Sequence, residues 1–201
     1  LVHPSELSVL GLPDVPPVLI NALSPEMSVL RTSMIPSLLS VVKWNKSRRN
    51  DDLAIFEIGR VFSSRGASVQ PVETEVMAAA FCGLVAGKRW DGKSQEWNYH
   101  SVAGLTEVLV DRIAKKRVRF STEKFGAMDS VTLKAGNSVV GRIVSVGGAV
   151  LKKFDIKESV IYVELYIAPL YELSTAVVKY KAVSKFPPSD RDIAVVTDAS
   201  V

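Results

Sequence analysis

Residues 30–62 read LRTSMIPSLLSVVKWNKSRRNDDLAIFEIGRVF, and this stretch decides the fold class of the chain. Its first half has apolar residues at helical spacing, and Pro36 suits a first helical turn, where no backbone N–H is needed. The residues expected to face the core are Leu38, Leu39, Val42 and Trp44. After a basic and polar break, residues 54–62 are rich in branched and aromatic side chains, which is typical of a strand.

The elements on either side predict a protein in which helices flank a largely antiparallel sheet. Before residue 30 we expect a short helix from Pro4, a strand at 18–20, and a helical turn at Pro25 capped by Ser24. The later strands are expected at 74–85, 118–121, 131–133, 139–146, 160–167, 177–181 and 190–196, and the later helices at 100–113, 149–154 and 169–173. This order of elements predicts the α+β class.

The helix near residue 100 has the strongest periodic pattern. Apolar residues recur three and four apart at Val102, Leu105, Leu109 and Ile113. We expect His100 to cap or precede this helix. Three cations, Lys115, Lys116 and Arg117, follow its last turn, where positive charge is favourable against the helix dipole.

Composition excludes several classes of protein. The chain has 201 residues, of which 47% are hydrophobic and 23% charged, as in ordinary globular proteins. No apolar run reaches the length of a membrane helix. A single cysteine, Cys82, cannot form an internal disulfide and lies in an apolar segment, so we expect a buried thiol and a cytoplasmic location. A net charge of +4 permits an anionic partner without requiring one.

Two prolines indicate a domain boundary near the end of the chain. Residues 184–188 read SKFPP, and the prolines disfavour helix before them. We therefore expect one module over residues 1–183, and a linker with the truncated start of a second domain over residues 184–201. Because the sequence begins with Leu1-Val2-His3 rather than Met, we also expect it to be a piece of a longer protein.

Four collinear blocks resemble the β subunit of bacterial phenylalanyl-tRNA synthetase. The blocks are ALSPEMSVLRTS at 22–33, FEIGRVF at 56–62, LKKFD at 151–155, and SKFP at 184–187 followed by RDIAV at 191–195. Each block alone is weak, and the order and spacing of all four give the specificity. The resemblance covers nearly the whole chain.

The resemblance implies a class II aminoacyl-tRNA synthetase-like fold whose module is not itself catalytic. In this family the α subunit makes phenylalanyl-adenylate from phenylalanine, ATP and magnesium and transfers phenylalanine to tRNA, while the β module supports assembly of the α and β subunits. The last residues would be the first strand of a ferredoxin-like anticodon-binding domain. The implied partners are the α subunit and tRNA, and the isolated piece could also form a homodimer.

The residues themselves offer no complete adenylation site. Such a site needs an arginine on the sheet for the α-phosphate, acids for magnesium, and a glycine-rich segment that ends in a second arginine. Arg60 stands where the first arginine might begin, but residues 160–173 contain neither Gly-x-Gly nor an arginine. We predict no catalytic, cofactor-binding or metal-binding residue in this chain, and expect ATP and magnesium to be used by the whole enzyme.

Seven residues remain as candidates for contacts with a subunit or with tRNA. Arg60 is expected at a sheet edge, paired with an acid such as Glu57 or with a carbonyl, and Arg31 is expected to tether a helix end. Trp90 and Trp97, near Lys88, Arg89 and Lys93, would suit base stacking or a protein interface. The cations Lys115, Lys116 and Arg117, with Arg119 nearby, would contact RNA phosphates or only solvate the helix end.

Two other functions stay open at this point. One is a divergent class II adenylate-forming enzyme that uses Arg60, and saturable binding of ATP with magnesium would favour it. The other is a free-standing RNA-binding domain that uses the basic loop around Trp90, and a tRNA titration at two salt concentrations would test it.

Overall fold

The computed structural model contains one six-stranded sheet with the strand order β1-β2-β6-β5-β4-β3. It describes residues 1–13, 15–66, 69–86, 90, 94–174, 185, 189, 191–194 and 196. The strands are β1 Leu53–Ser63, β2 Val72–Cys82, β3 Val118–Phe125, β4 Met128–Ala135, β5 Ser138–Ser145 and β6 Val160–Tyr166. All five neighbouring pairs are antiparallel, which confirms the predicted fold class.

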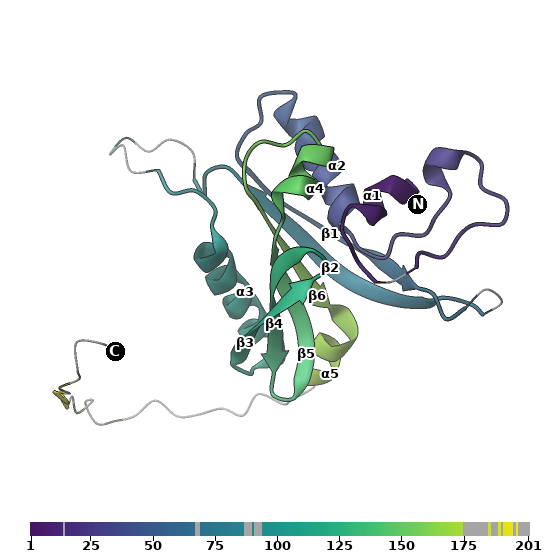
Figure 1. Cartoon of the computed structure of the whole chain (residues 1–201). Coiled ribbons are helices and arrows are strands. Elements are labelled where there is room, and N and C mark those ends of the chain that lie inside the picture. The colour runs from purple at the N-terminus through teal and green to yellow at the C-terminus, as the bar shows by residue number, and fades with distance from the viewer. Residues whose placement is uncertain are drawn as a thin grey trace.

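Helices and the N-terminal segment cover the two faces of this sheet (Figure 1). The helices are α1 Pro4–Ser8, α2 Ile35–Lys46, α3 Tyr99–Ala114, α4 Gly148–Lys153 and α5 Ile167–Ser174, with a 3-10 turn at Pro25–Met27. One apolar cluster joins α2, α4 and the N-terminal segment to the sheet, and a second joins α3 and α5 to it. The sheet is thus the middle layer between two cores.

One of the four residues of α2 expected to face the core is exposed instead. Leu38, Leu39 and Val42 are buried as expected, but Trp44 is 55% exposed. Two residues beyond Val42 correspond to about 200° around a helix, so Trp44 points away from the sheet. There the Arg48 guanidinium lies 3.6 Å from the centre of its ring.

Helix α3 packs with a face rotated slightly from the predicted stripe, since Val102 is buried and Leu109 and Ile113 are partly buried against the core as expected. Its buried residues are Val102, Ala103, Thr106, Val110 and Ala114, whereas Leu105 is 49% exposed. The cap differs as well, because the side chain of Asn98, not His100, accepts from the backbone N–H of Ser101.

Tight turns order β3, β4 and β5 into two consecutive hairpins. Gly136 has φ +64° at the β4–β5 turn, as the Gly-Asn pair predicts, and Gly126 has φ +60° at the β3–β4 turn. The second turn packs against the N-terminal segment, since Ala127 N–H donates to Leu10 O over 3.3 Å. The predicted strands at 118–121 and 131–133 were therefore too short.

Predictions at the two ends of the chain fare less well. Residues 18–20 form only one bridge, between Val18 and Val29, and Ile20 is 98% exposed. Ser24 makes no side-chain cap to its turn. The strand expected at 190–196 is not formed over residues 191–194, and the one expected at 177–181 lies outside the described residues. A strand needs a neighbour, and the described part of the sheet offers none to residues 191–194.

Candidate functional site

A row of paired residues crosses the sheet at right angles to its strands, on the face that α2 covers. Because directly paired residues point to the same side of a sheet, their side chains lie next to one another. The row runs through Glu57, Ala78, Glu164, Arg142, Thr132 and Ser121. It is polar at five of its six positions, although it crosses a sheet whose neighbouring residues are mostly apolar.

At the sheet-edge end of this row, the Arg31 side chain makes several hydrogen bonds. The Arg31 side chain donates to Glu57 Oε1 over 3.0 Å, to the Arg60 carbonyl over 3.0 Å, and to Ser37 Oγ over 3.3 Å. Gly59 makes room for it, because a Cβ there would lie 2.5 Å from Arg31 Nη2. Arg31 therefore ties the segment before α2 to β1, as the tether prediction requires.

The centre of the row is a buried network of an acid, an arginine and two tyrosines. Tyr162 donates its hydroxyl hydrogen to Glu164 Oε2 over 2.7 Å. Arg142 Nε lies 3.7 Å from Glu164 Oε1 and donates to Tyr166 Oη over 3.0 Å, while its guanidinium stacks 4.3 Å from the ring centre of Phe125. The positive charge of Arg142 is thereby directed at protein groups.

Burial sets the protonation properties of this network. Loss of solvent raises the pKa of Glu164 above 4.5, although hydrogen bonding from Tyr162 and the charge of Arg142 oppose the rise. Burial and the nearby Glu164 charge likewise raise the pKa of Tyr162 well above 10.0. Tyr162 therefore stays protonated at neutral pH and acts as a donor to the carboxylate.

Arg60 is paired with an acid at the sheet edge, but the acid is not Glu57. Its Nη1 lies 3.0 Å from Glu73 Oε2 on the neighbouring strand β2. Glu57 is bonded to Arg31, and because side chains alternate along a strand, Glu57 and Arg60 point to opposite faces of the sheet. The Arg60 side chain remains 62% exposed, so this pair contributes little to folding.

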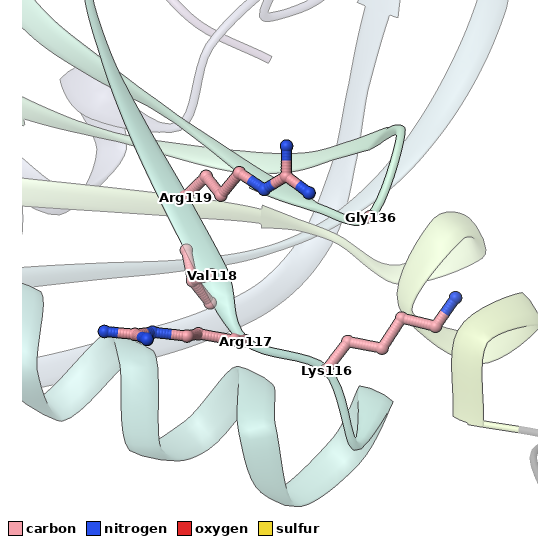
Figure 2. A pocket seen from close by; sticks show the side chains of 5 residues that line it. All are labelled: Lys116, Arg117, Val118, Arg119 and Gly136. Atoms are coloured by element: carbon pink, nitrogen blue, oxygen red, sulfur yellow. The ribbon is translucent and has the colours of Figure 1, made fainter.

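The basic residues that follow α3 lie at the other edge of the sheet. Lys115 has left-handed geometry at φ 52° and turns the chain from α3 into β3. Beyond it is a hollow of about 590 Å³ (Figure 2), which is lined by Lys116, Arg117, Val118, Arg119 and Gly136. The structure thus brings Lys116 and Arg117 together with Arg119, as their sequence proximity suggests, and adds the β4–β5 turn.

The two candidate tryptophans have different surroundings. Trp97 is half-buried and its ring centre lies 4.7 Å from that of Phe81, so it belongs mainly to the core. Trp90 is 97% exposed. The basic residues proposed to accompany them, Lys88, Arg89 and Lys93, lie outside the described residues.

A third charged cluster lies at the end of α2. Lys46 Nζ lies 2.9 Å from Glu158 Oε1 and 3.7 Å from Asp51 Oδ1. Burial lowers the pKa of Lys46, but the hydrogen bond with Glu158 and neighbouring charges outweigh it, and the net pKa is raised. Burial raises the pKa of the Cys82 thiol beside this cluster.

In the part of the chain that the structure describes, no three His, Cys, Asp or Glu side chains gather in a way that could hold a metal ion. No helix there is long and apolar enough to span a membrane. The polar row and the basic hollow are thus the two arrangements from which a functional argument can start.

The chain has the fold of the class II tRNA synthetases. The chain superposes on the pyrrolysyl-tRNA synthetase of Desulfitobacterium hafniense with a TM-score of 0.60 and 16% identity, covering 84% of this chain and 58% of that one. A similar match is found to the prolyl-tRNA synthetase of Giardia lamblia, with a TM-score of 0.61 and 13% identity over 86% of this chain and 40% of the other. Identities this low show the fold alone.

Within that class the chain belongs to a single family, the CLM domain of the phenylalanyl-tRNA synthetase beta chain, whose model matches residues 2–167. A phenylalanine–tRNA ligase beta subunit from Bacillus subtilis is 34% identical over 92% of this chain and 23% of its own length. The corresponding subunit of Geobacillus kaustophilus is 30% identical over 100% of this chain and 26% of its length. The chain thus spans about a quarter of these relatives, and the predicted family is confirmed.

Proposed function

We propose that this chain is a non-catalytic structural module of a phenylalanine–tRNA ligase β subunit. It supports assembly with the α subunit in the ATP-dependent charging of tRNA with phenylalanine. ATP and magnesium are used by the whole enzyme and are not bound by this module. We also propose that the chain functions in the cytoplasm.

The observation that carries this proposal is that the arginines near the sheet's polar row already have protein partners. Binding a nucleoside triphosphate needs cations that face the ligand and neutralise the negative charge on several phosphate oxygens. Arg31 is bonded to Glu57, Arg60 to Glu73, and Arg142 to Tyr166 near Glu164. Redirecting Arg142 to a phosphate would leave the Glu164 carboxylate buried without its counter-charge, which is strongly unfavourable.

An exposed apolar face at the β1 edge supports the assembly role. Phe56 and Ile58 are 66% and 58% exposed. Both lie on the face of the sheet that α3 and α5 cover elsewhere, but neither belongs to the apolar cluster beneath these helices. Further along the same edge, the backbone of β1 is already hydrogen-bonded to Arg31. Phe62 N–H donates to the Arg31 carbonyl, and the Arg31 side chain donates to the Arg60 carbonyl. We assign the apolar part of this edge, with Arg31 and Arg60 beside it, to contact with the α subunit.

Co-expression with the α subunit tests this assignment. The double variant Phe56→Asp/Ile58→Asp should shift the complex to free subunits in size-exclusion chromatography with light scattering. Phe120→Asp is the matched control, because Phe120 is a 40% exposed aromatic residue on the opposite edge strand β3. If the double variant still forms the complex with the α subunit, the β1 edge is not part of the interface. The same measurement on the chain alone detects a homodimer.

Calorimetry separates the module from a divergent adenylate-forming enzyme. The chain alone should give no saturable heat when it is titrated with ATP and magnesium. Saturable binding that Arg60→Ala abolishes would instead establish a nucleotide site and contradict the non-catalytic proposal.

A further inference from the structure

Cations from two parts of the chain line the hollow at the end of α3, and a third cation is paired with one of them across the sheet. Lys116 comes from the α3–β3 connection, Arg119 from β3 and Lys134 from β4. Lys116 Nζ lies 3.6 Å from the point where a Cβ on Gly136 would be, which places it over the β4–β5 turn. Lys116 and Arg119 line the hollow (Figure 2), and Lys134 lies beside Arg119 on the same face of the sheet; we call these three residues the basic cleft.

Two of these cations are placed directly opposite each other. Arg119 pairs with Lys134 in the antiparallel register of β3 and β4. Like charges at directly paired positions destabilise a sheet, and an opposite charge at either position would stabilise it. The arrangement therefore weakens the fold unless an anion lies over the pair.

The cleft is not neutralised from within the described residues. None of its three cations has an ion pair or side-chain hydrogen bond to another described residue, in contrast to Arg31, Arg60 and Arg142. Arg117 is set apart because it also lines a neighbouring hollow of about 430 Å³ together with Glu107 and Asp111. The charge available to a ligand is thus that of the cleft itself.

The lining indicates what kind of anion fits. A protein partner would need apolar surface to bury at the centre of its contact, and the only apolar side chain lining the described hollow is Val118, which is itself buried. Nucleic-acid interfaces are more polar and more positive. The hollow also has no amide or carboxylate side chain among its lining residues with which to read a base edge.

We propose that the basic cleft binds the phosphodiester backbone of RNA without reading its sequence. This site is separate from the β1 edge assigned to assembly, and the proposal does not depend on that assignment. Binding of RNA phosphates by lysine and arginine releases counterions, so its affinity should fall steeply as salt rises.

The test uses fluorescence anisotropy of the 201-residue chain with labelled tRNA and with labelled single-stranded RNA across a salt series. The variant Lys116→Ala/Arg119→Ala should bind about tenfold more weakly at about 0.1 M salt. Its salt slope should be smaller in magnitude by about 2, one for each lost phosphate contact. The matched control is Lys152→Ala/Lys153→Ala, which removes the same charge from exposed positions on α4 and should change affinity by less than about twofold.

A second variant distinguishes a loss of RNA binding from a loss of folding. Lys134→Gln removes the like-charge pair, so the Tm should rise by about 1–3 °C while RNA affinity falls. A change of opposite sign in stability and affinity cannot come from partial unfolding.

Several outcomes would overturn the proposal. They are the absence of saturable RNA binding by the unaltered chain at low salt, an equal loss of affinity in the α4 control, and a fall of both Tm and affinity in Lys134→Gln. Inorganic tripolyphosphate that bound more tightly than RNA would assign the cleft to small polyphosphates instead.

Discussion

The two edges of the sheet treat their positive charges in opposite ways. At and near the β1 edge, Arg31 and Arg60 are each bonded to a carboxylate, and Arg142 in the middle of the sheet is held by Tyr166 and Glu164. At the β3 edge, Lys116, Arg119 and Lys134 have no such partner among the described residues.

The comparison shows that the number of cations does not decide whether a surface can hold phosphate. What decides it is whether the guanidinium or ammonium groups are already satisfied by the protein. Cations bonded within the protein stabilise the fold and are unavailable to a ligand, whereas unpaired ones leave the fold slightly weaker and remain available.

The largest effect is expected at Arg142. Arg142→Met should destabilise the chain by about 3 kcal/mol at neutral pH, because it leaves the buried Glu164 carboxylate without its counter-charge. A carboxyl whose pKa is raised in the folded state destabilises the fold as pH rises above the pKa of the unfolded state. The cost of the substitution should therefore grow as pH rises from about 4.5. Urea unfolding at several pH values measures both quantities.

Arg60→Met is the matched control for that experiment. It breaks an exposed pair with Glu73 and should cost less than about 1 kcal/mol at any pH. Equal costs for the two variants would mean that the buried network does not depend on Arg142, and the contrast between buried and exposed arginines would fail.

A smaller effect is expected at Arg31. Arg31→Ala removes the hydrogen bonds to Glu57, to the Arg60 carbonyl and to Ser37, and should cost about 1–2 kcal/mol, because Glu57 keeps access to water. Arg31→Lys should recover part of this stability, since an ammonium cannot reproduce the planar fork. Chemical denaturation ranks the variants.

Coupling with Gly59 sharpens the Arg31 prediction. A Cβ at Gly59 would lie 2.5 Å from Arg31 Nη2, so Gly59→Ala should displace the guanidinium. The same substitution should cost much less in the Arg31→Ala background, where this space is empty. Additive costs in the double-mutant cycle would show that the two residues do not share this contact.

The smallest effect is expected for the ion pair at the end of α2. Hydrogen bonding to Lys46 lowers the pKa of Glu158 below 4.5, so the pair contributes stability above that pH and loses it as pH falls through the lowered pKa. Glu158→Gln should cost about 0.5 kcal/mol at pH 7, because Glu158 is half exposed. Below the lowered pKa the variant and the original chain should melt at the same temperature, and a constant difference across pH would contradict the pair.

Most of the fold could be predicted from local sequence. The strand at 54–62 and the helix near Leu38 follow from periodicity and propensity, and the Gly136 turn follows from its Gly-Asn pair. The antiparallel arrangement follows from the order of elements. These features depend on residues close together in the chain.

The exposure of Leu105 was not predicted, because the rotation of α3 about its axis decides which side chains are buried. An apolar pattern does not define that rotation when the buried residues are small. Ala103 and Thr106 contribute little to a hydrophobic pattern, yet they form the contact surface of α3, while the more hydrophobic Leu105 faces solvent. The Asn98 cap could have been found, because asparagine is among the residues preferred at the position that precedes a helix.

The partners of the arginines could not be predicted from spacing along the chain. Arg60 is three residues from Glu57 but is bonded to Glu73 on β2, which lies diagonally across from it, while its directly paired residue is Glu75. The network of Arg142, Glu164 and Tyr166 likewise requires the pairing of β5 with β6. Sequence reasoning missed it because none of the three residues forms a recognisable motif.

Cys82 gives the chain a practical property. It is the only cysteine in the sequence, it is fully buried, and its thiol pKa is raised, so little reactive thiolate exists at neutral pH. A cysteine introduced at an exposed position would then carry nearly all of the labelling chemistry. Fluorophores or spin labels could be attached one at a time to either edge of the sheet without first removing the native sulfur.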